Sequence, residues 1–149
     1  MLIVHLLTAN TKNGWILRDE DEYYKGAAQG MGRRVNNSFE SEVQEIVMAM
    51  QHVWSKGYQR VIFESDCKKV IDTLNHRCLH FDGHNWIRYA LWWKQKFNEV
   101  EFTWTNRESN KAANKMAKQQ IPFDFSFYFH YYVPPSITLD LLNDYVNSH

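Results

Sequence analysis

The sequence predicts an α/β domain with a five-stranded mixed sheet, in which three antiparallel strands precede parallel strands and helices flank the sheet. The first observation is a series of three short apolar segments separated by turn residues, which is typical of an antiparallel meander. The second is the later alternation of strand and helix patterns, because strand–helix–strand connections place strands in parallel. The third is size, since 149 residues that are 44% hydrophobic suffice for one ordered core.

The three opening strands are predicted from short apolar runs bounded by polar residues. Residues 2–7 (LIVHLL) and 14–19 (GWILRD) have strand length, and residues 23–31 form a third strand that is rich in small side chains. The acidic run at 19–22 falls between the second and third strands. We interpret it as the solvated tip of a hairpin rather than as a metal site.

A long helix and a fourth strand follow the meander. Asn37 and Ser38 favour a helix start, and Gly57 ends the helix after about Lys56. Helical spacing groups the apolar side chains on one stripe, which comprises Phe39, Val43, Ile46, Val47, Met50, Val53 and Trp54. Residues 60–65 (RVIFES) then form the fourth strand.

The second half of the chain alternates helices with one more strand. We expect a short helix at 67–75, a loop at 76–83, an alternating strand at 100–105 and a last helix at 109–120. A helix at 85–97 carries an apolar stripe of Trp86, Tyr89, Ala90, Trp93 and Phe97. This spacing favours a place in the core for Trp86 and Trp93. A base-stacking surface is the alternative for the tryptophans Trp54, Trp86, Trp92 and Trp93.

The chain divides into a domain at 1–121 and a C-terminal aromatic extension at 122–149. Five aromatic side chains stand at alternate positions of the extension, namely Phe123, Phe125, Phe127, Phe129 and Tyr131. A period of two predicts an added strand or an extended arm. Because so much apolar surface is rarely left in water, we expect the extension to pack on its own domain. Pairing across a homodimer is the alternative, and we favour the monomer.

Composition narrows the class of protein. The formal net charge is zero, whereas a dedicated duplex binder usually has a basic excess, so any nucleic-acid affinity must come from a local patch. Two cysteines, Cys67 and Cys78, make neither a disulfide framework nor a zinc site, and they fit reduced thiols in the cytoplasm or nucleus. No apolar run approaches the roughly 20 residues of a membrane helix. The apolar start lacks a basic leader, so we expect no signal peptide.

One motif near the C-terminus gives the sequence a family resemblance. The segment from Arg107 to Ala117 (RESNKAANKMA) resembles the pattern that closes ribonuclease H domains, Arg-x-x-Asn, two residues, then Ala-Asp-x-Leu-Ala. Further matching segments are GWILRDED at 14–21, FESE at 39–42, VIFESDCK at 61–68, HFDGHNWIR at 80–88 and the aromatic tail. Together they resemble most closely the plant ribonuclease H-like domain of reverse-transcriptase (non-LTR retroelement) origin, from about Gly14 to the end.

The resemblance implies a ribonuclease H-like fold and a metal-dependent site. Enzymes of this family cut the RNA strand of an RNA–DNA hybrid with two Mg²⁺ ions about 4 Å apart. Four carboxylates hold the metals: one on the first strand, one on the first helix, one after the fourth strand and one on the last helix. The resemblance assigns catalytic positions to Glu42, Asp66 and Asn114, with metal ligation by Glu42 and Asp66. It assigns nucleic-acid binding to Arg107, Asn110 and Lys111.

The geometry of the predicted elements is compatible with two of these positions. Glu42 lies about 80° from the centre of the apolar helix stripe and so beside the sheet, whereas Glu45 lies about 140° away and should face solvent. Asp66 directly follows the fourth strand, and chemistry collects at the carboxyl ends of strands in α/β sheets. Capping of the following helix is an alternative role for Asp66.

Two of the four carboxylates have no counterpart in the sequence. Asn114 replaces the last aspartate with a neutral amide. The first strand has no acid before Asp19, and His5 is either an ordinary core or surface histidine or the occupant of the vacant position. We therefore expect Mg²⁺ to bind weakly or not at all, with Mn²⁺ as a possible substitute.

Other polar clusters are weaker candidates. His76, His80 and His84 recur every four residues near Cys78, but Gly83 interrupts a continuous helix, so we do not interpret them as a metal site. The lysines and arginines form either a phosphate-facing patch or a solvated face, and they are Lys68, Lys69, Lys94, Lys96, Arg107, Lys111 and Lys115.

The favoured function is a nucleic-acid-binding domain that is catalytically impaired, with an RNA–DNA hybrid or another nucleic acid as its partner and no membrane. An active or residual Mg²⁺-dependent hybrid ribonuclease is the first alternative. A protein-interaction module derived from a retroelement domain is the second.

Overall fold

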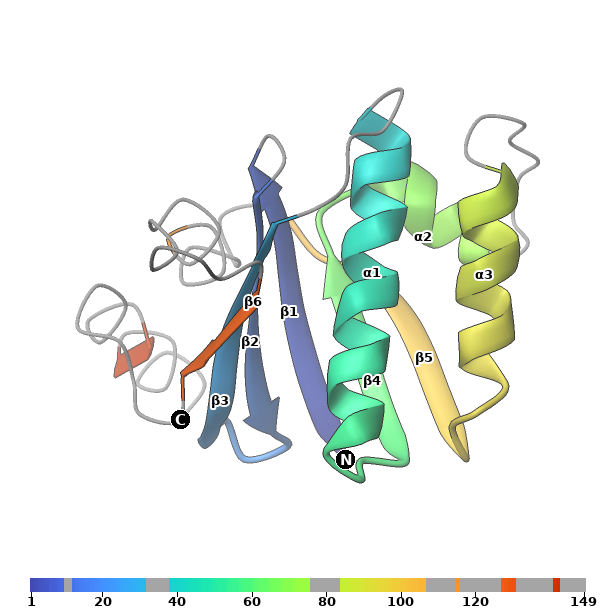
Figure 1. Ribbon diagram of the computed structural model, residues 1–149. Helices are drawn as coiled ribbons and strands as arrows, with labels where there is room; N and C mark the ends of the chain where they lie inside the picture. Colours follow the sequence, from blue (N-terminus) through green and yellow to red (C-terminus); the bar gives the residue numbers. More distant parts are fainter. Residues whose placement is uncertain are drawn as a thin grey trace.

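The computed structural model describes residues 1–9, 12–31, 38–75, 84–106, 115, 127–130 and 141–142 (Figure 1). Within these residues one mixed sheet has the strand order β5-β4-β1-β2-β3-β6. The elements are β1 Leu2–Ala9, β2 Lys12–Asp19, β3 Tyr24–Met31, α1 Ser38–Ser55, β4 Arg60–Ser65, α2 Lys68–Leu74, α3 His84–Lys94, β5 Glu99–Trp104 and β6 Phe127–His130. The predicted α/β class and its five strands are confirmed.

The sheet combines the two kinds of pairing that the sequence predicts. Strands β1, β2 and β3 form the antiparallel meander, and β1, β4 and β5 pair in parallel. Helices α1 and α3 lie side by side over one face of the sheet, as Figure 1 shows. Since β1 is the central strand that belongs to both halves, the two kinds of pairing meet on it.

The core lies between that face of the sheet and the helices. Inward side chains alternate along the strands, so that Val4 and Leu6 of β1 and Val61 and Phe63 of β4 are fully buried. Phe63 stacks on Phe102 of β5, with ring centroids 5.9 Å apart. Trp86 and Trp93 are partly buried and pack against this core, which confirms the prediction that they contribute to it.

The expected exposure of Glu45 is wrong, because Glu45 is fully buried. The apolar stripe of α1 accounts for only part of its buried surface. The helix is covered by the sheet on one side and by α2 and α3 on the others, so the buried arc also includes Ser41, Gln44 and His52. Helical phase alone finds the centre of a buried face but not its width.

The C-terminal extension contributes a sixth strand. Strand β6 pairs antiparallel with β3, and the ring of Phe129 lies 4.9 Å from that of His52 on α1. Gly26 lies beneath this ring with φ of 149°, and a Cβ there would come within 2.5 Å of the Phe129 side chain. The remaining extension lies outside the described residues, apart from 141–142. Among the helices described, none combines the length and the apolar character that a membrane span requires.

A buried hydrogen bond joins the meander to α1. The indole Nε1 of Trp15 donates to Nδ1 of His52 over 2.9 Å, so this imidazole nitrogen carries no proton. Burial, reinforced by the positive charge of Lys56, lowers the pKa of His52 to about 4. The folded protein therefore holds His52 neutral at pH 7.

This arrangement predicts a loss of stability in mild acid. The pKa of His52 is lower in the folded state than in the unfolded state, so the unfolded chain binds the proton more tightly as the pH falls below about 6.5. We expect the free energy of unfolding to fall by about 1–2 kcal/mol between pH 7 and pH 5, measured by urea titration. His52→Gln keeps an acceptor for Trp15 but does not titrate, so it should remove most of this dependence. An equal loss in both proteins would contradict the assignment.

Candidate active site

The candidate site lies at the edge where β1 and β4 end. The two strands pair in parallel, with Leu6 opposite Ser65. Continuing that register by one residue places position 7 of β1 beside Asp66, which follows β4 directly. Carboxyl ends of neighbouring parallel strands therefore meet where the sequence predicts a catalytic edge.

Glu42 and Asp66 are brought to this edge by different elements. Glu42 lies in the second turn of α1, and both side chains are partly exposed. Both carboxylates act on the partly buried thiol of Cys67 at the N-terminus of α2. Burial raises the pKa of the Cys67 thiol, backbone N–H groups of α2 oppose this, and the charges of Glu42 and Asp66 raise it further. The start of α1 and the end of β4 thus converge around one thiol.

Asp66 sits in a hydrogen-bonded turn. The indole Nε1 of Trp104 donates to the backbone carbonyl of Asp66 over 3.1 Å. The hydroxyl of Ser65 accepts from the Cys67 amide over 3.1 Å, and the Ser65 carbonyl accepts from the Thr105 amide over 3.0 Å. The N-cap position of α2 is occupied by Cys67, so Asp66 stands one residue before the cap. These three hydrogen bonds hold the backbone of the turn, and Asp66 is partly exposed at the edge.

Trp104 also lies at this edge, and the sequence analysis did not identify it. It is the last residue of β5 and pairs with Ser65 of β4, and its side chain remains 52% exposed. The signal available in the sequence was its position, since the end of a strand that neighbours β4 must lie at the same edge. An exposed indole beside Asp66 offers a flat apolar surface next to the carboxylates.

The other predicted site residues lie elsewhere or are not described. Asn114 lies outside the described residues, as do Arg107, Asn110 and Lys111. In the parts of the chain that are described, no three His, Cys, Asp or Glu side chains gather as a metal site would require. Of the proposed donors, only Glu42 and Asp66 can therefore be placed.

His5 does not stand beside Asp66. It is opposite Glu64 in the strand register, and its Nδ1 lies 2.8 Å from the Glu64 carboxylate. Burial tends to raise the pKa of Glu64, but the hydrogen bond and charge of His5 and the charge of Arg18 outweigh it and lower the pKa. Arg18 in turn forms a 2.8 Å ion pair with Glu22. His5 belongs to this polar network, two residues before position 7.

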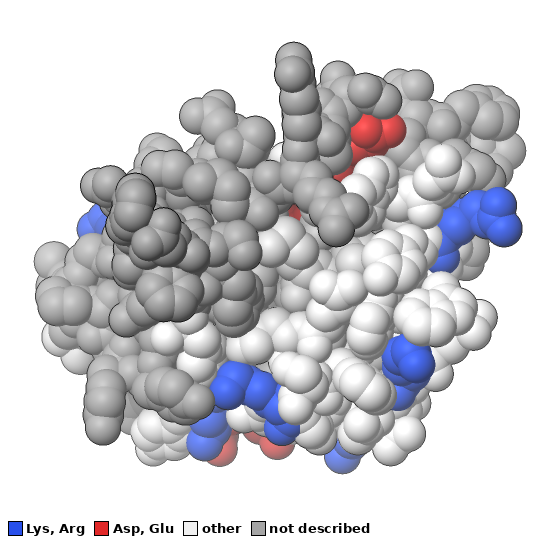
Figure 2. Space-filling model, viewed as in Figure 1, with Lys and Arg blue, Asp and Glu red and all other residues white. Residues whose placement is uncertain are grey.

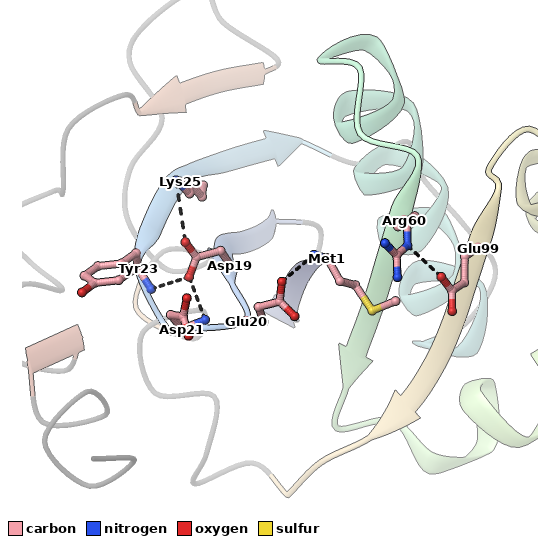
Figure 3. Close-up of polar contacts among 8 residues, drawn as sticks. All are labelled: Met1, Asp19, Glu20, Asp21, Tyr23, Lys25, Arg60 and Glu99. Atoms are coloured by element: carbon pink, nitrogen blue, oxygen red, sulfur yellow. Dashed lines mark hydrogen bonds and ion pairs between the residues drawn. The ribbon is translucent and has the colours of Figure 1, made fainter.

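The acidic run at 19–22 forms a turn at the opposite end of the sheet, as predicted (Figure 3). Asp19 accepts hydrogen bonds from the amides of Asp21 and Tyr23 at 2.9 and 3.0 Å, and Lys25 lies 3.7 Å from its carboxylate. An open cleft of about 300 Å³ lies near this turn and reaches Arg60. Because it borders the beginnings of β1 and β4, it is separate from the Asp66 edge.

Comparisons with known proteins agree with this architecture. The model of the reverse transcriptase-like family matches residues 4–120. RNase H1 from the halophilic archaeon Halobacterium salinarum NRC-1 is 17% identical, with a TM-score of 0.69 over 78% of this chain and 95% of that one. LC11-RNase H1 in complex with RNA/DNA hybrid is 11% identical, with a TM-score of 0.70 over 79% and 94%. A search of curated protein sequences found no significant match.

A third solved structure extends the comparison to bacteria. The N-terminal RNase H domain of a Mycobacterium tuberculosis protein is 15% identical, with a TM-score of 0.65 over 78% of this chain and 95% of that one. At identities this low, the structural likenesses establish the fold. The ribonuclease H-like fold that the sequence motifs imply is thereby confirmed.

The shared influence on Cys67 gives a direct test of the site geometry. In a Cys78→Ser background, Glu42→Gln and Asp66→Asn should each lower the pKa of the Cys67 thiol, because each removes a negative charge that disfavours the thiolate. The pH dependence of thiol alkylation measures this pKa. Glu40→Gln, two residues earlier on the same helix, is the matched control and should leave the profile unchanged. A profile insensitive to Glu42 and Asp66 would show that the two carboxylates do not converge.

Proposed function

We propose that this chain, which belongs to the reverse transcriptase-like family, is a ribonuclease H-like nucleic-acid-binding domain whose catalytic site is impaired. The observation that carries the proposal is the lack of any Asp or Glu in β1 at the edge where Asp66 stands. Asn114, where the family motif has an aspartate, supports it. The motif set also supports descent from a plant non-LTR retroelement, which we include in the proposal.

The donor set does not fit a pair of divalent ions. Two Mg²⁺ ions close together repel each other strongly, so such a site needs several carboxylates around them. Glu42 and Asp66 supply two, position 7 is leucine and position 114 is asparagine. When bound in a competent site, the metals would activate water and stabilise the leaving oxygen. The residues here support at most weak binding of one ion through Glu42 and Asp66.

Several features support nucleic acid as the ligand. LC11-RNase H1, whose fold this chain shares, was solved in complex with RNA/DNA hybrid. The exposed indole of Trp104 lies beside Asp66 and offers a surface on which a base or sugar can pack. Arg107, Asn110 and Lys111 follow β5 in the chain and supply polar and cationic groups for phosphates. We propose that the hybrid is bound along this edge.

Residual nuclease activity is the alternative that a specific observation favours. Glu42 and Asp66 are both retained and converge on Cys67. An asparagine carbonyl can also ligate a cation, although it brings no negative charge. The distinction between impaired and residual activity is therefore one of rate.

A cleavage assay tests the proposal. We expect the chain to cut a labelled RNA–DNA hybrid at least about a thousandfold more slowly than a ribonuclease H with all four carboxylates, since the loss of one stabilising group already costs about 10²–10³. The assay should be run with Mg²⁺ and with Mn²⁺. Asp66→Asn is the control for contaminating nuclease and should be no slower than the unmodified chain. Robust Mg²⁺-dependent cleavage that Asp66→Asn abolishes would overturn the proposed impairment.

Restoring the missing acids should restore metal affinity. Because position 7 lies beside Asp66 in register, Leu7→Asp together with Asn114→Asp should strengthen Mg²⁺ binding more than Asn114→Asp alone. Isothermal titration calorimetry measures the affinity, and circular dichroism checks that each variant folds. Asn98→Asp adds the same charge at the other end of β5 and should leave Mg²⁺ binding unchanged. Equal affinities in all variants would show that positions 7 and 114 are not part of the site.

A further inference from the structure

The face formed by the C-terminal halves of α1 and α3 carries exposed aromatic side chains. Trp54 is 40% exposed, Tyr89 41% and Trp92 49%, although such large rings are usually buried. Trp86 and Trp93 lie beneath them, partly buried against the core. We call this group the aromatic platform, comprising Trp54, Trp86, Tyr89, Trp92, Trp93 and Lys96.

The rings of the platform are held in a defined arrangement. Along α3, the Tyr89 ring lies 6.4 Å from that of Trp86 and 6.1 Å from that of Trp92, with which it stacks at 23°. The Tyr89 hydroxyl accepts a 3.1 Å hydrogen bond from Gln51 on α1. Trp93 meets Trp54 and Trp92 edge to face at 5.7 and 5.4 Å. Two helices therefore build one ordered surface that needs no rearrangement to present flat rings.

A lysine is integrated into this surface. The Lys96 ammonium lies 4.5 Å from the ring centroid of Trp92, 5.3 Å from that of Trp54 and 5.7 Å from that of Trp93. Cation–π attraction keeps its charge at the platform. A negatively charged ligand that packs on Trp92 would therefore also contact the Lys96 ammonium.

The charged side chains of α3 and of the turn that follows it are basic. Residues 84–98 contain Arg88, Lys94 and Lys96 and no Asp or Glu, and the Lys94 ammonium lies 5.7 Å from the ring centroid of Phe102 on β5. The Lys56 ammonium lies 3.9 Å from the ring centroid of Phe129 on β6, so Lys56 does not belong to the platform. In Figure 2 the surface over α1 and α3 is a broad white area, with blue groups at its right and lower margins and red groups at its upper margin. A chain with zero net charge thus has basic side chains beside this group of exposed aromatic rings.

The platform is separate from the Asp66 edge. Glu42 and Trp54 stand twelve residues apart on α1, which is roughly 18 Å along the helix axis. The Glu42 end of α1 faces the carboxyl ends of the parallel strands, and Trp54, Trp92 and Lys96 of the platform lie toward the other end. A ligand on the platform need not touch the carboxylates.

We propose that the aromatic platform binds unpaired, single-stranded nucleic acid. Exposed rings on which bases stack, interleaved with lysines that meet phosphates, are the features by which proteins hold single strands without reading sequence. The positive charge at the platform disfavours cationic ligands and a second copy of the chain. The Lys96 ammonium would repel an external cation at the rings, and a second copy of this face would bring a second ammonium against it.

This inference goes beyond hybrid binding at the Asp66 edge and does not depend on it. A domain with both surfaces would hold a duplex at one end and a flanking single strand at the other. If one surface does not bind its proposed ligand, binding at the other can still be tested, because the two surfaces share no residues.

The test measures fluorescence anisotropy of a short labelled oligouridine and of a short labelled oligothymidine. Trp92→Leu and Tyr89→Leu should each weaken binding at least about fivefold, the loss expected from one stacked base. Lys96→Gln should reduce the slope of log affinity against log salt by about 0.7, as expected for one phosphate contact to a single strand. Tyr23→Leu and Lys25→Gln alter an exposed aromatic ring and an exposed lysine elsewhere, and they should change neither quantity.

Three results would overturn the proposal. The first is an affinity for single strands that Trp92→Leu and Tyr89→Leu leave intact. The second is a loss in which Tyr23→Leu matches the platform variants, because binding would then be unspecific. The third is self-association of the unmodified chain in sedimentation analysis that Trp92→Leu abolishes, since the platform would then bind another copy. Loss of hybrid binding in Trp104→Leu, with single-strand binding retained, would separate the two surfaces.

Discussion

The parallel pairing of β1 with β4 is the constraint on which the rest of this structure depends. Strand β1 is the middle of the sheet, antiparallel to β2 on one side and parallel to β4 on the other. A parallel neighbour requires a crossover, and α1 supplies it across one face. The same pairing aligns the carboxyl ends of β1 and β4, so Asp66 and position 7 are neighbours whatever side chains they carry. The site's geometry is thus a property of the backbone and persists when its acids are replaced.

The crossover helix links this edge to the two other features of interest. Its first turns carry Glu42 toward Cys67. Its last turn contributes the buried His52 to the hydrogen bond with Trp15 and carries Trp54 to the aromatic platform. The helix is therefore buried along much of its length but exposed in patches at both ends. Since α1 packs on both the sheet and α3, any change in its position would alter both the Asp66 edge and the aromatic platform.

Much of the fold could be predicted from the sequence because its periodicities are undisturbed. The strand predicted at 60–65 has its observed bounds, because the segment RVIFES follows the helix that Gly57 ends. Burial of Glu45 could not be predicted, because it depends on how neighbouring elements cover α1 rather than on the helix's own pattern. Trp104 was missed for a related reason: its role comes from the pairing of β5 with β4. The assignments of Glu42 and Asp66 came from motif resemblance, and the shared effect on Cys67 supports their convergence.

The loss of acids changes what the edge can bind, not only what it can catalyse. Four carboxylates at one edge repel phosphates unless divalent ions neutralise them. With leucine at position 7 and asparagine at position 114, two of those charges are absent. On the proposed function, the edge then needs less metal to accept a nucleic-acid backbone, and Trp104 remains to contact it. Substitutions that remove the nuclease chemistry would in this way lower the electrostatic cost of binding the same ligand without cutting it.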